Sequence, residues 1–237
     1  MGKMGGSRHL KRFAAPGFWP IPKKERRWVV KPSPGPHPIE ACIPLLLVVR
    51  DVLKLATTAR EVKRIIKSGK VLIDGRPVFD HKFPVGLMDT VCMPDADIHL
   101  RATSDASKFI KFIEIPEEET NLKVVRIKRK QTVRGGRIQL TGHDGRNFLA
   151  DGQLSGVKVG DSLLIRVPSQ EVLEVLPFEV GCTALVVKGR KAGRIGKVRE
   201  IGEYVRIVDA DNPSLSYLTL KESIIVVGRE APSIRVR

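Results

Sequence analysis

The chain has 237 residues, and 42 Lys plus Arg against 26 Asp plus Glu give it a formal net charge of +16. Such an excess of cations attracts polyanions, of which nucleic acid and anionic membrane surfaces are the common ones. No apolar run approaches the roughly 20 residues that span a bilayer, and the N-terminal segment MGKMGGSRHLKRF lacks the apolar centre of a signal peptide. We therefore expect a soluble, intracellular chain without a membrane partner.

Cysteine and histidine are scattered along the chain. Cys42, Cys92 and Cys182 form no close pair, and the five histidines show no ligand spacing. We predict buried, free thiols, with neither a disulfide framework nor a metal site.

Residues 1–42 have the composition of a basic, proline-rich arm. Up to residue 38 the segment contains seven of the 16 prolines and nine cations, opposed only by Glu25. The alternating prolines of KPSPGPHP exclude a helix, and no apolar periodicity marks a core. The segment is predicted to be extended or disordered until a partner holds it.

Aromatic residues are interleaved with the cations of this arm: Phe13, Phe18, Trp19 and Trp28. Aromatic rings stack on bases while Lys and Arg neutralise phosphates, so this pattern favours nucleic-acid binding. The alternatives are a solvated tail, or aromatics that dock on the chain's own globular part. The predicted contacts are Arg8, Lys11, Arg12, Trp19, Lys23, Lys24, Arg26, Arg27 and Trp28.

The sequence becomes helical from Pro44. PLLLVVRDVLKLA fits a short buried helix, and Thr57 or Thr58 can cap a second helix that runs to about Ser68. Apolar residues at helical spacing would face a core and leave cations at i, i+3, i+4 and i+7 on another side. These cations are Arg60, Lys63, Arg64 and Lys67, here called the basic stripe.

A strand, a turn and a return strand are predicted after this helix. Gly69 ends the helix, KVLID is a strand, Asp74-Gly75 is a tight turn, and RPVFD starts the return. Two helices followed by SGKVLIDGRPV resemble the S-four RNA-binding module, over about Ile43 to Met93. The resemblance implies that the basic stripe, with Lys70 and Arg76, contacts RNA phosphates.

Residues 94–176 are predicted to form a β domain. KFIKFIEI, KVVRIKRKQTV, GRIQLTG, RNFLA and DSLLIRVP are separated by turn signals, which indicates a small barrel or sandwich. The acidic run Glu117–Glu119 is interpreted as a solvated turn rather than a metal site.

Residues 177–237 are predicted to form a second β module. VGCTALVVKGRKAGRIGKVREI gives a strand, a loop rich in Gly and cations, and a strand, and it resembles the KOW motif of SH3-like barrels. Glycines let such a loop approach a phosphate backbone. The spacing excludes a nucleotide-binding phosphate loop, because Gly189 and Gly193 are one residue too close and no Ser or Thr follows Lys197. The predicted contacts are Lys188, Arg190, Lys191, Arg194 and Lys197.

The order of modules also resembles a family. An arm with HLKRFAAPGFW and PSPGPH, an S-four module, a β domain and a KOW module are similar to the archaeal and eukaryotic-type S-four-e family of small-subunit ribosomal proteins, over essentially the whole chain. The fold class is α+β and multi-module: an extended N-terminal arm (1–42), a small α/β S-four module (43–93), a central β-barrel-like domain (94–176) and a C-terminal SH3-like barrel (177–237).

The resemblance implies a structural role in the cytoplasm, in the small ribosomal subunit. The expected partners are small-subunit ribosomal RNA and neighbouring ribosomal proteins, without cofactor, metal, small-molecule substrate or catalysis. Low counts of thermolabile residues fit an archaeal source. Two alternatives remain: an RNA-modifying enzyme of the pseudouridine-synthase kind, for which Asp151 is the nearest aspartate, and a KOW-type transcription factor.

Overall fold

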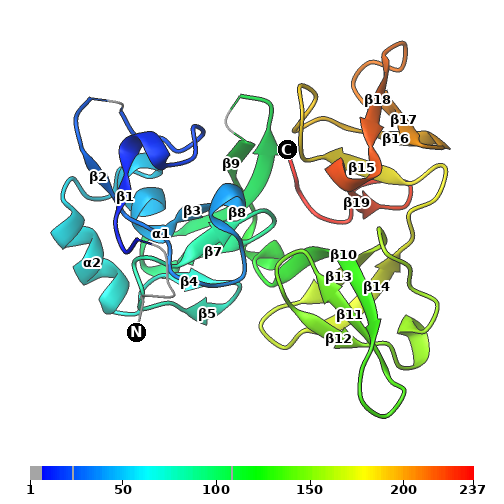
Figure 1. The fold of residues 1–237 in the computed structure, drawn as a ribbon, viewed down its shortest axis with the longest axis horizontal. Coiled ribbons are helices and arrows are strands. Elements are labelled where there is room, and N and C mark those ends of the chain that lie inside the picture. The colour runs from blue at the N-terminus through cyan, green and yellow to red at the C-terminus, as the bar shows by residue number, and fades with distance from the viewer. Residues whose placement is uncertain (1–6, 23, 108) are drawn as a thin grey trace.

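The computed structural model describes residues 7–22, 24–107 and 109–237, so the predicted contact Lys23 lies outside the described residues. Its main elements are three five-stranded antiparallel sheets, each with its own apolar core (Figure 1). Within the described residues, no helix is both long and apolar enough to cross a membrane.

The first unit is an antiparallel sheet with helical segments. Its helices are α1 (Leu45–Leu47), which continues as a π-helical turn (Val48–Val52), and α2 (Ala59–Lys67). Its sheet has the order β5 (Arg76–Pro77), β4 (Leu72–Ile73), β7 (Thr90–Met93), β8 (Ile98–Asp105), β9 (Phe109–Glu114). A separate strand pair joins β3 (Cys42–Pro44) to β6 (Pro84–Gly86).

The predicted boundary after Met93 differs from this arrangement. Strands β8 and β9, assigned to the central domain from sequence, complete the first sheet, since β8 pairs with β7 from Thr90 to Met93. The part of the KFIKFIEI segment that forms β9 therefore belongs to the first unit. Its period-2 pattern predicted a strand but carried no information about which sheet the strand would join.

The central sheet follows. It contains β10 (Leu122–Thr132), β11 (Ile138–Gly142), β12 (Asn147–Leu149), β13 (Ser162–Arg166) and β14 (Glu171–Leu176), in the order β12-β11-β10-β13-β14. The long strand β10 pairs with β13 through its first half and with β11 through its second.

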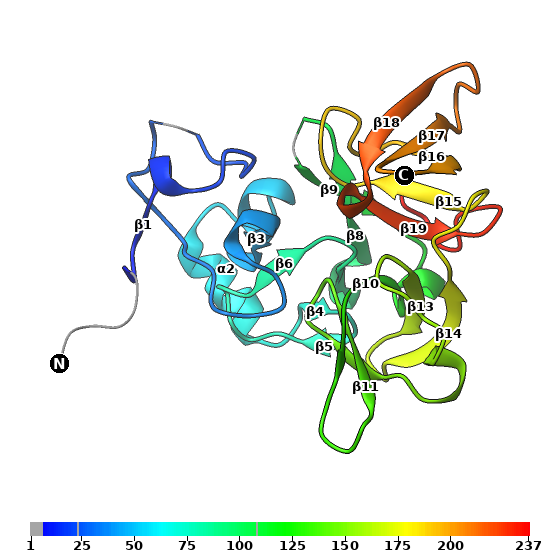
Figure 2. The ribbon, with the colours of Figure 1, turned by 45° about the vertical axis from the view of Figure 1, so that its right-hand side comes forward.

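The C-terminal sheet has the order β18-β17-β16-β15-β19. Its strands are β15 (Thr183–Val186), β16 (Ile195–Ile201), β17 (Tyr204–Asp209), β18 (Ser216–Leu220) and β19 (Ile224–Gly228). Its core includes Val124, Leu164 and Leu176 of the central sheet, so the two β units pack on each other. Figure 2 shows them stacked, with the first unit beside both.

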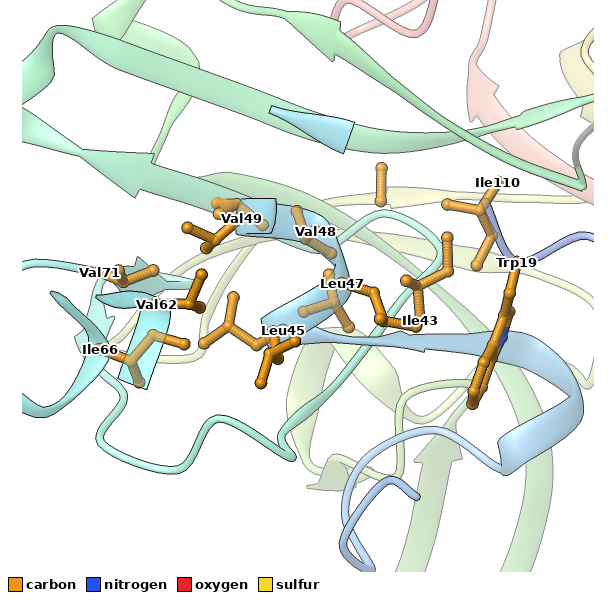
Figure 3. Packing of buried hydrophobic residues seen from close by; sticks show 14 of the residues in the cluster. Trp19, Ile43, Leu45, Leu47, Val48, Val49, Val62, Ile66, Val71 and Ile110 are labelled. Carbon is orange, nitrogen blue, oxygen red and sulfur yellow. The ribbon is translucent and has the colours of Figure 1, made fainter. Parts of the chain in front are cut away.

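The arm is not free, which corrects the sequence prediction of an extended or disordered segment. Strands β1 (Leu10–Lys11) and β2 (Trp28–Val29) pair with each other. Leu10, Trp19 and Ile21 are buried in the core of the first unit, and Figure 3 shows Trp19 in one cluster with Ile43 and Ile110. This apolar burial holds the arm on the globular part, the outcome that the docking alternative anticipated.

Candidate nucleic-acid interface

The basic stripe lies on a helix with a well-defined start. Thr58 caps α2: its Oγ1 accepts from the backbone N–H of Glu61 at 3.3 Å, and the Glu61 carboxylate accepts from the N–H of Thr58 at 3.2 Å. The hydrogen bond that the carboxylate accepts from the Thr58 N–H lowers the pKa of Glu61. The capping box satisfies amide groups that a helix start otherwise leaves without partners, so it fixes where the helix begins.

Burial of one face of α2 determines which face remains in solvent. Val62 and Ile66 are fully buried in the first core. The side chains of Arg60, Lys63, Arg64 and Lys67 are exposed and form no hydrogen bond or ion pair within the described residues. The sequence prediction of a contiguous, outward-facing row of cations is therefore confirmed as geometry.

The two further cations predicted beside the stripe have partners within the chain. Lys70 pairs with Asp95 at 2.7 Å, although both side chains are more than half exposed. Arg76 donates to the carbonyl of Pro168 at 3.1 Å, at the junction with the central sheet, and is also exposed. An exposed ion pair contributes little stability, so Lys70 can exchange Asp95 for a phosphate at small cost.

Arg12 and Trp19 must be removed from the predicted contacts. The Arg12 guanidinium is buried and donates from Nε and Nη2 to the carbonyl of Ile21, at 3.0 and 2.8 Å. Trp19 is 2% exposed, and its Nε1 donates to the carbonyl of Cys42 at 2.7 Å. Both residues hold the arm on the first unit, so neither presents a surface to RNA.

Other arm residues do remain available. Trp28 is 52% exposed, with the Arg27 guanidinium 5.4 Å from its ring centre and the His9 ring 5.5 Å away. Phe13 is 88% exposed. The remaining exposed cations predicted here are Arg8, Lys11, Lys24, Arg26 and Arg27. An exposed ring flanked by cations is suited to stacking on a base beside a phosphate.

In the loop between β15 and β16, Gly193 is required for a contact within the chain, whereas the sequence predicted that the loop glycines allow approach to a phosphate backbone. A Cβ on Gly193 would lie 2.7 Å from the carbonyl oxygen of Ser104, and Ser104 Oγ donates to the carbonyl of Val187 at 2.9 Å. This glycine thus permits close approach of the loop to the end of β8 in the first unit. Lys188, Arg190, Lys191 and Lys197 are exposed, whereas Arg194 pairs with Asp209.

The predicted cations do not form one continuous patch. In Figure 1, α2 lies at the outer edge of the first unit, whereas the β15–β16 loop lies where the first unit meets the C-terminal sheet. The arm and the first unit share one apolar core, so the arm cations and the basic stripe belong to one packed unit.

A buried charge cluster, here called the polar hub, joins the first unit, the arm and the central sheet. Lys123 Nζ lies 2.7 Å from Asp74, 2.6 Å from Asp89 and 3.1 Å from Asp144. Arg146 bridges Asp74 and Asp144, and His37 lies 3.1 Å from Asp89. Sequence reasoning missed this cluster, because its members come from segments far apart in the chain.

The cations and carboxylates of the hub compensate one another's charge. Burial by itself would raise the pKa of Asp89, but His37 and Lys123 hold that pKa below its ordinary value. Burial would likewise lower the pKa of Lys123, and the three carboxylates raise it instead. Each of the three carboxylates lies against a cation of the chain, so the hub joins the units through buried ion pairs.

Asp151, the nearest aspartate for the enzyme alternative, lies apart from this hub. It is exposed and precedes the turn Gly152–Leu154. One residue of the acidic run Glu117–Glu119 has partners within the chain. Glu119 accepts from Arg101 at 2.7 Å and from the backbone N–H of Arg235 at 2.8 Å.

Three small, interlocked units, a saturated buried charge cluster and cations projecting into solvent define a nucleic-acid-binding protein of structural type. Three family models match the chain: the RS4NT (NUC023) domain over residues 4–40, the S4 domain over residues 45–91 and Ribosomal family S4e over residues 96–172. The chain belongs to the S4e family of small-subunit ribosomal proteins, as its relatives show.

Named relatives match along the whole chain. The small ribosomal subunit protein eS4 of Korarchaeum cryptofilum is 57% identical over 237 residues, covering 100% of both chains. The protein of the same name from Methanothermobacter thermautotrophicus is 43% identical, covering 97% of this chain and 96% of its own. A crystal structure of the 30S ribosomal protein S4e from Thermoplasma acidophilum superposes with a TM-score of 0.66 at 28% identity, covering 78% of this chain and 93% of the other. The family is ribosomal and structural, and nothing in these matches supports the enzyme or transcription-factor alternatives.

Proposed function

We propose that this chain is a structural constituent of the small ribosomal subunit in the cytoplasm and that it binds small-subunit ribosomal RNA. Family membership supports the setting. The observation that carries the contact itself is the basic stripe, whose four cations lack partners in the described chain although their helix is rigidly placed. Pre-positioned, unpaired cations are what phosphate binding requires.

Two further surfaces are proposed to contact the same RNA. One is the exposed part of the arm around Trp28, where a ring and cations adjoin. The other is the β15–β16 loop, which we interpret as a KOW-type loop, and the C-terminal sheet as an SH3-like barrel beside a barrel-like central domain. Neighbouring ribosomal proteins are proposed to cover the surfaces that RNA leaves free.

The salt dependence of RNA binding tests the stripe. Arg60, Lys63 and Lys67 are changed together to Glu in the full chain, and affinity for small-subunit ribosomal RNA is measured across salt concentrations. The log–log slope should become shallower by roughly 0.7 to 0.9 for each phosphate that is no longer neutralised, about 2 to 3 in total.

A matched control carries the same change at three exposed cations outside the proposed surfaces, Lys111, Arg199 and Lys221. Its slope should change much less. Thermal unfolding of both variants verifies that the fold is intact. Equal slopes for the stripe variant and the unaltered protein would overturn the proposed contact.

A further inference from the structure

The hairpin formed by β10 and β11 extends beyond the body of the central sheet. β10 leaves its pairing with β13 at Arg126 and continues with β11 alone to Thr132, and Val133 N–H donates to the carbonyl of Arg137 at 2.8 Å to close the turn. Gly135 and Gly136 both have positive φ, and nothing lies within 4 Å of a Cβ at either. Figures 1 and 2 both show this hairpin projecting away from the three units.

The hairpin carries positive charge that the chain itself does not neutralise. No Asp or Glu occurs between Glu119 and Asp144. Four exposed cations of the hairpin make no side-chain hydrogen bond or ion pair in the described parts of the chain: Lys128, Arg129, Arg134 and Arg137. Lys130 differs, because its Nζ donates to the carbonyl of Val157 at 2.8 Å. Like charges held on one narrow ribbon repel each other, so an anionic partner would stabilise it.

One face of the hairpin presents polar groups in a row. The register places Arg129 opposite Thr141 and Gln131 opposite Gln139. On β12, Asn147 follows next to Thr141, and the partly exposed Leu149 borders the row next to Gln139. Side chains of cross-strand partners share a face of the sheet. Amides, a hydroxyl and a guanidinium on a flat surface can donate to phosphates and to ribose 2′-hydroxyls.

The composition of the hairpin selects between two kinds of RNA target. Residues 122–142 contain no aromatic side chain, whereas single-stranded RNA is held chiefly by stacking on aromatics. The minor groove of an RNA double helix is wide and shallow and displays 2′-hydroxyls, so it accepts a flat polar ribbon.

We infer that the β10–β11 hairpin is a separate binding element for base-paired RNA, which lies along a minor groove and bonds the flanking phosphates. The inference rests on the proposed function, since it assigns a second element of the chain to the same ribosomal RNA. Arg129, Arg134 and Arg137 bind phosphates, and Gln131 and Gln139 face the groove. The hairpin is thus distinct from the arm, where the exposed ring of Trp28 is proposed to stack on unpaired bases.

The test compares three probes with the full chain: an RNA duplex of about 20 base pairs, one of its strands alone, and a DNA duplex of the same sequence. The hairpin variant replaces Arg129, Arg134 and Arg137 with Gln. Its control replaces Lys111, Arg199 and Lys221 with Gln, which removes the same charge elsewhere. Fluorescence anisotropy over a range of salt concentrations gives affinities and slopes.

We expect the unaltered protein to bind the RNA duplex more tightly than the DNA duplex. The hairpin variant should lose about tenfold or more in affinity for the RNA duplex, with a slope shallower by about 2 to 3, and keep most of its affinity for the single strand. A loss equal to that of the control, or an equal loss on the duplex and the single strand, would overturn the inference.

The stripe variant separates this inference from the proposed function. If the hairpin variant matches its control while the Arg60, Lys63 and Lys67 variant still loses ribosomal RNA binding, the hairpin inference fails and the proposed function stands.

A chelate that generates hydroxyl radicals, attached through Gln131→Cys, gives independent support if it cleaves both strands of one rRNA helix. Cleavage confined to loops would contradict the groove. The native thiols are all buried, so they do not compete for the label.

Discussion

The ammonium of Lys123 lies 2.6 Å from Oδ1 of Asp89; Lys123 belongs to β10 of the central sheet, whereas Asp89 directly precedes β7 of the first unit. Both side chains are at most 2% exposed. The pair sits within the polar hub, where two further carboxylates, Asp74 and Asp144, contact the same ammonium. The placement of the first unit relative to the central sheet therefore depends on a few buried charges.

Lys123→Met should destabilise the protein strongly. The substitution removes the common cation and leaves three buried carboxylates without it, which costs about 3 to 5 kcal/mol for a broken buried network. Chemical denaturation measures the change in free energy of unfolding. Lys128→Met, at an exposed cation that has no partner among the described residues, serves as control and should change it by less than about 0.5 kcal/mol. Equal effects would show that the hub does not hold the units together.

Acid should destabilise the fold through His143. Its Nδ1 accepts from the N–H of Arg126 at 3.2 Å while its Nε2 lies 3.2 Å from the carbonyl of Leu87, an arrangement that suits the neutral ring. Burial lowers the pKa of His143 to about 4, from an ordinary value of 6.5.

The sign of the pH effect follows from these two values. The unfolded chain binds a proton at His143 between about pH 6.5 and pH 4, whereas the folded chain does not, so stability falls as the pH falls, by at most about 1.4 kcal/mol per unit. His143→Gln should flatten that part of the stability curve, whatever its stability at neutral pH. The same slope in both proteins would assign the acid sensitivity to other groups.

The two tryptophans should separate folding from binding. Trp19→Ala empties a buried site and removes a hydrogen bond to Cys42, so it should cost about 3 to 5 kcal/mol. Trp28→Ala, at a half-exposed ring, should change stability little and weaken RNA binding. Thermal unfolding and RNA affinity are measured for both variants. A loss of stability in Trp28→Ala but not in Trp19→Ala would mean that Trp19 does not hold the arm on the first unit.

Deletion of residues 1–38 is expected to lower stability for the same reason. The deletion removes Trp19 and Ile21 from the first core and His37 from its contact with Asp89. This differs from what the arm's composition alone predicts, namely that the remaining chain folds unaffected. A truncated protein as stable as the full chain would show that these contacts contribute nothing.

Gly193→Ala and Gly189→Ala should differ in their effects. Both glycines have positive φ, which costs an alanine roughly 1 to 2 kcal/mol. Only at Gly193 would the added Cβ also meet the carbonyl of Ser104, so this variant should lose more stability and loosen the loop from the first unit. Hydrogen exchange at the N–H of Val187, which donates to Ser223, reports such loosening nearby. Equal losses would leave backbone strain as the whole effect.

Features encoded by neighbouring residues could be predicted from sequence. A cap at Thr57 or Thr58, the buried face of α2 and the outward stripe follow from residue types and spacing around one helix, and the structure confirms them, with Thr58 as the cap. The Asp74-Gly75 turn is likewise present, with positive φ at both residues. Such signals are local, so no knowledge of the rest of the fold is needed.

Features that depend on contacts between residues far apart in the chain could not be predicted from the sequence. Arg12 has the same local setting as Lys11, yet it is buried because the carbonyl of Ile21 accepts its hydrogen bonds. The hub residues Asp89 and Lys123 are 34 positions apart and become neighbours only when the first unit packs on the central sheet. Membership of β8 and β9 in the first sheet is likewise a matter of topology, which strand periodicity does not encode.

Sedimentation of a native lysate tests the central claim most directly. The protein is followed through a sucrose gradient at low salt and again after a high-salt wash, with small-subunit ribosomal RNA as the marker. The proposed role predicts that the protein stays with the small subunit through the wash, because many RNA contacts and the packing of neighbouring proteins hold it there. Migration near the top of the gradient, or complete release by the wash, would contradict a structural constituent.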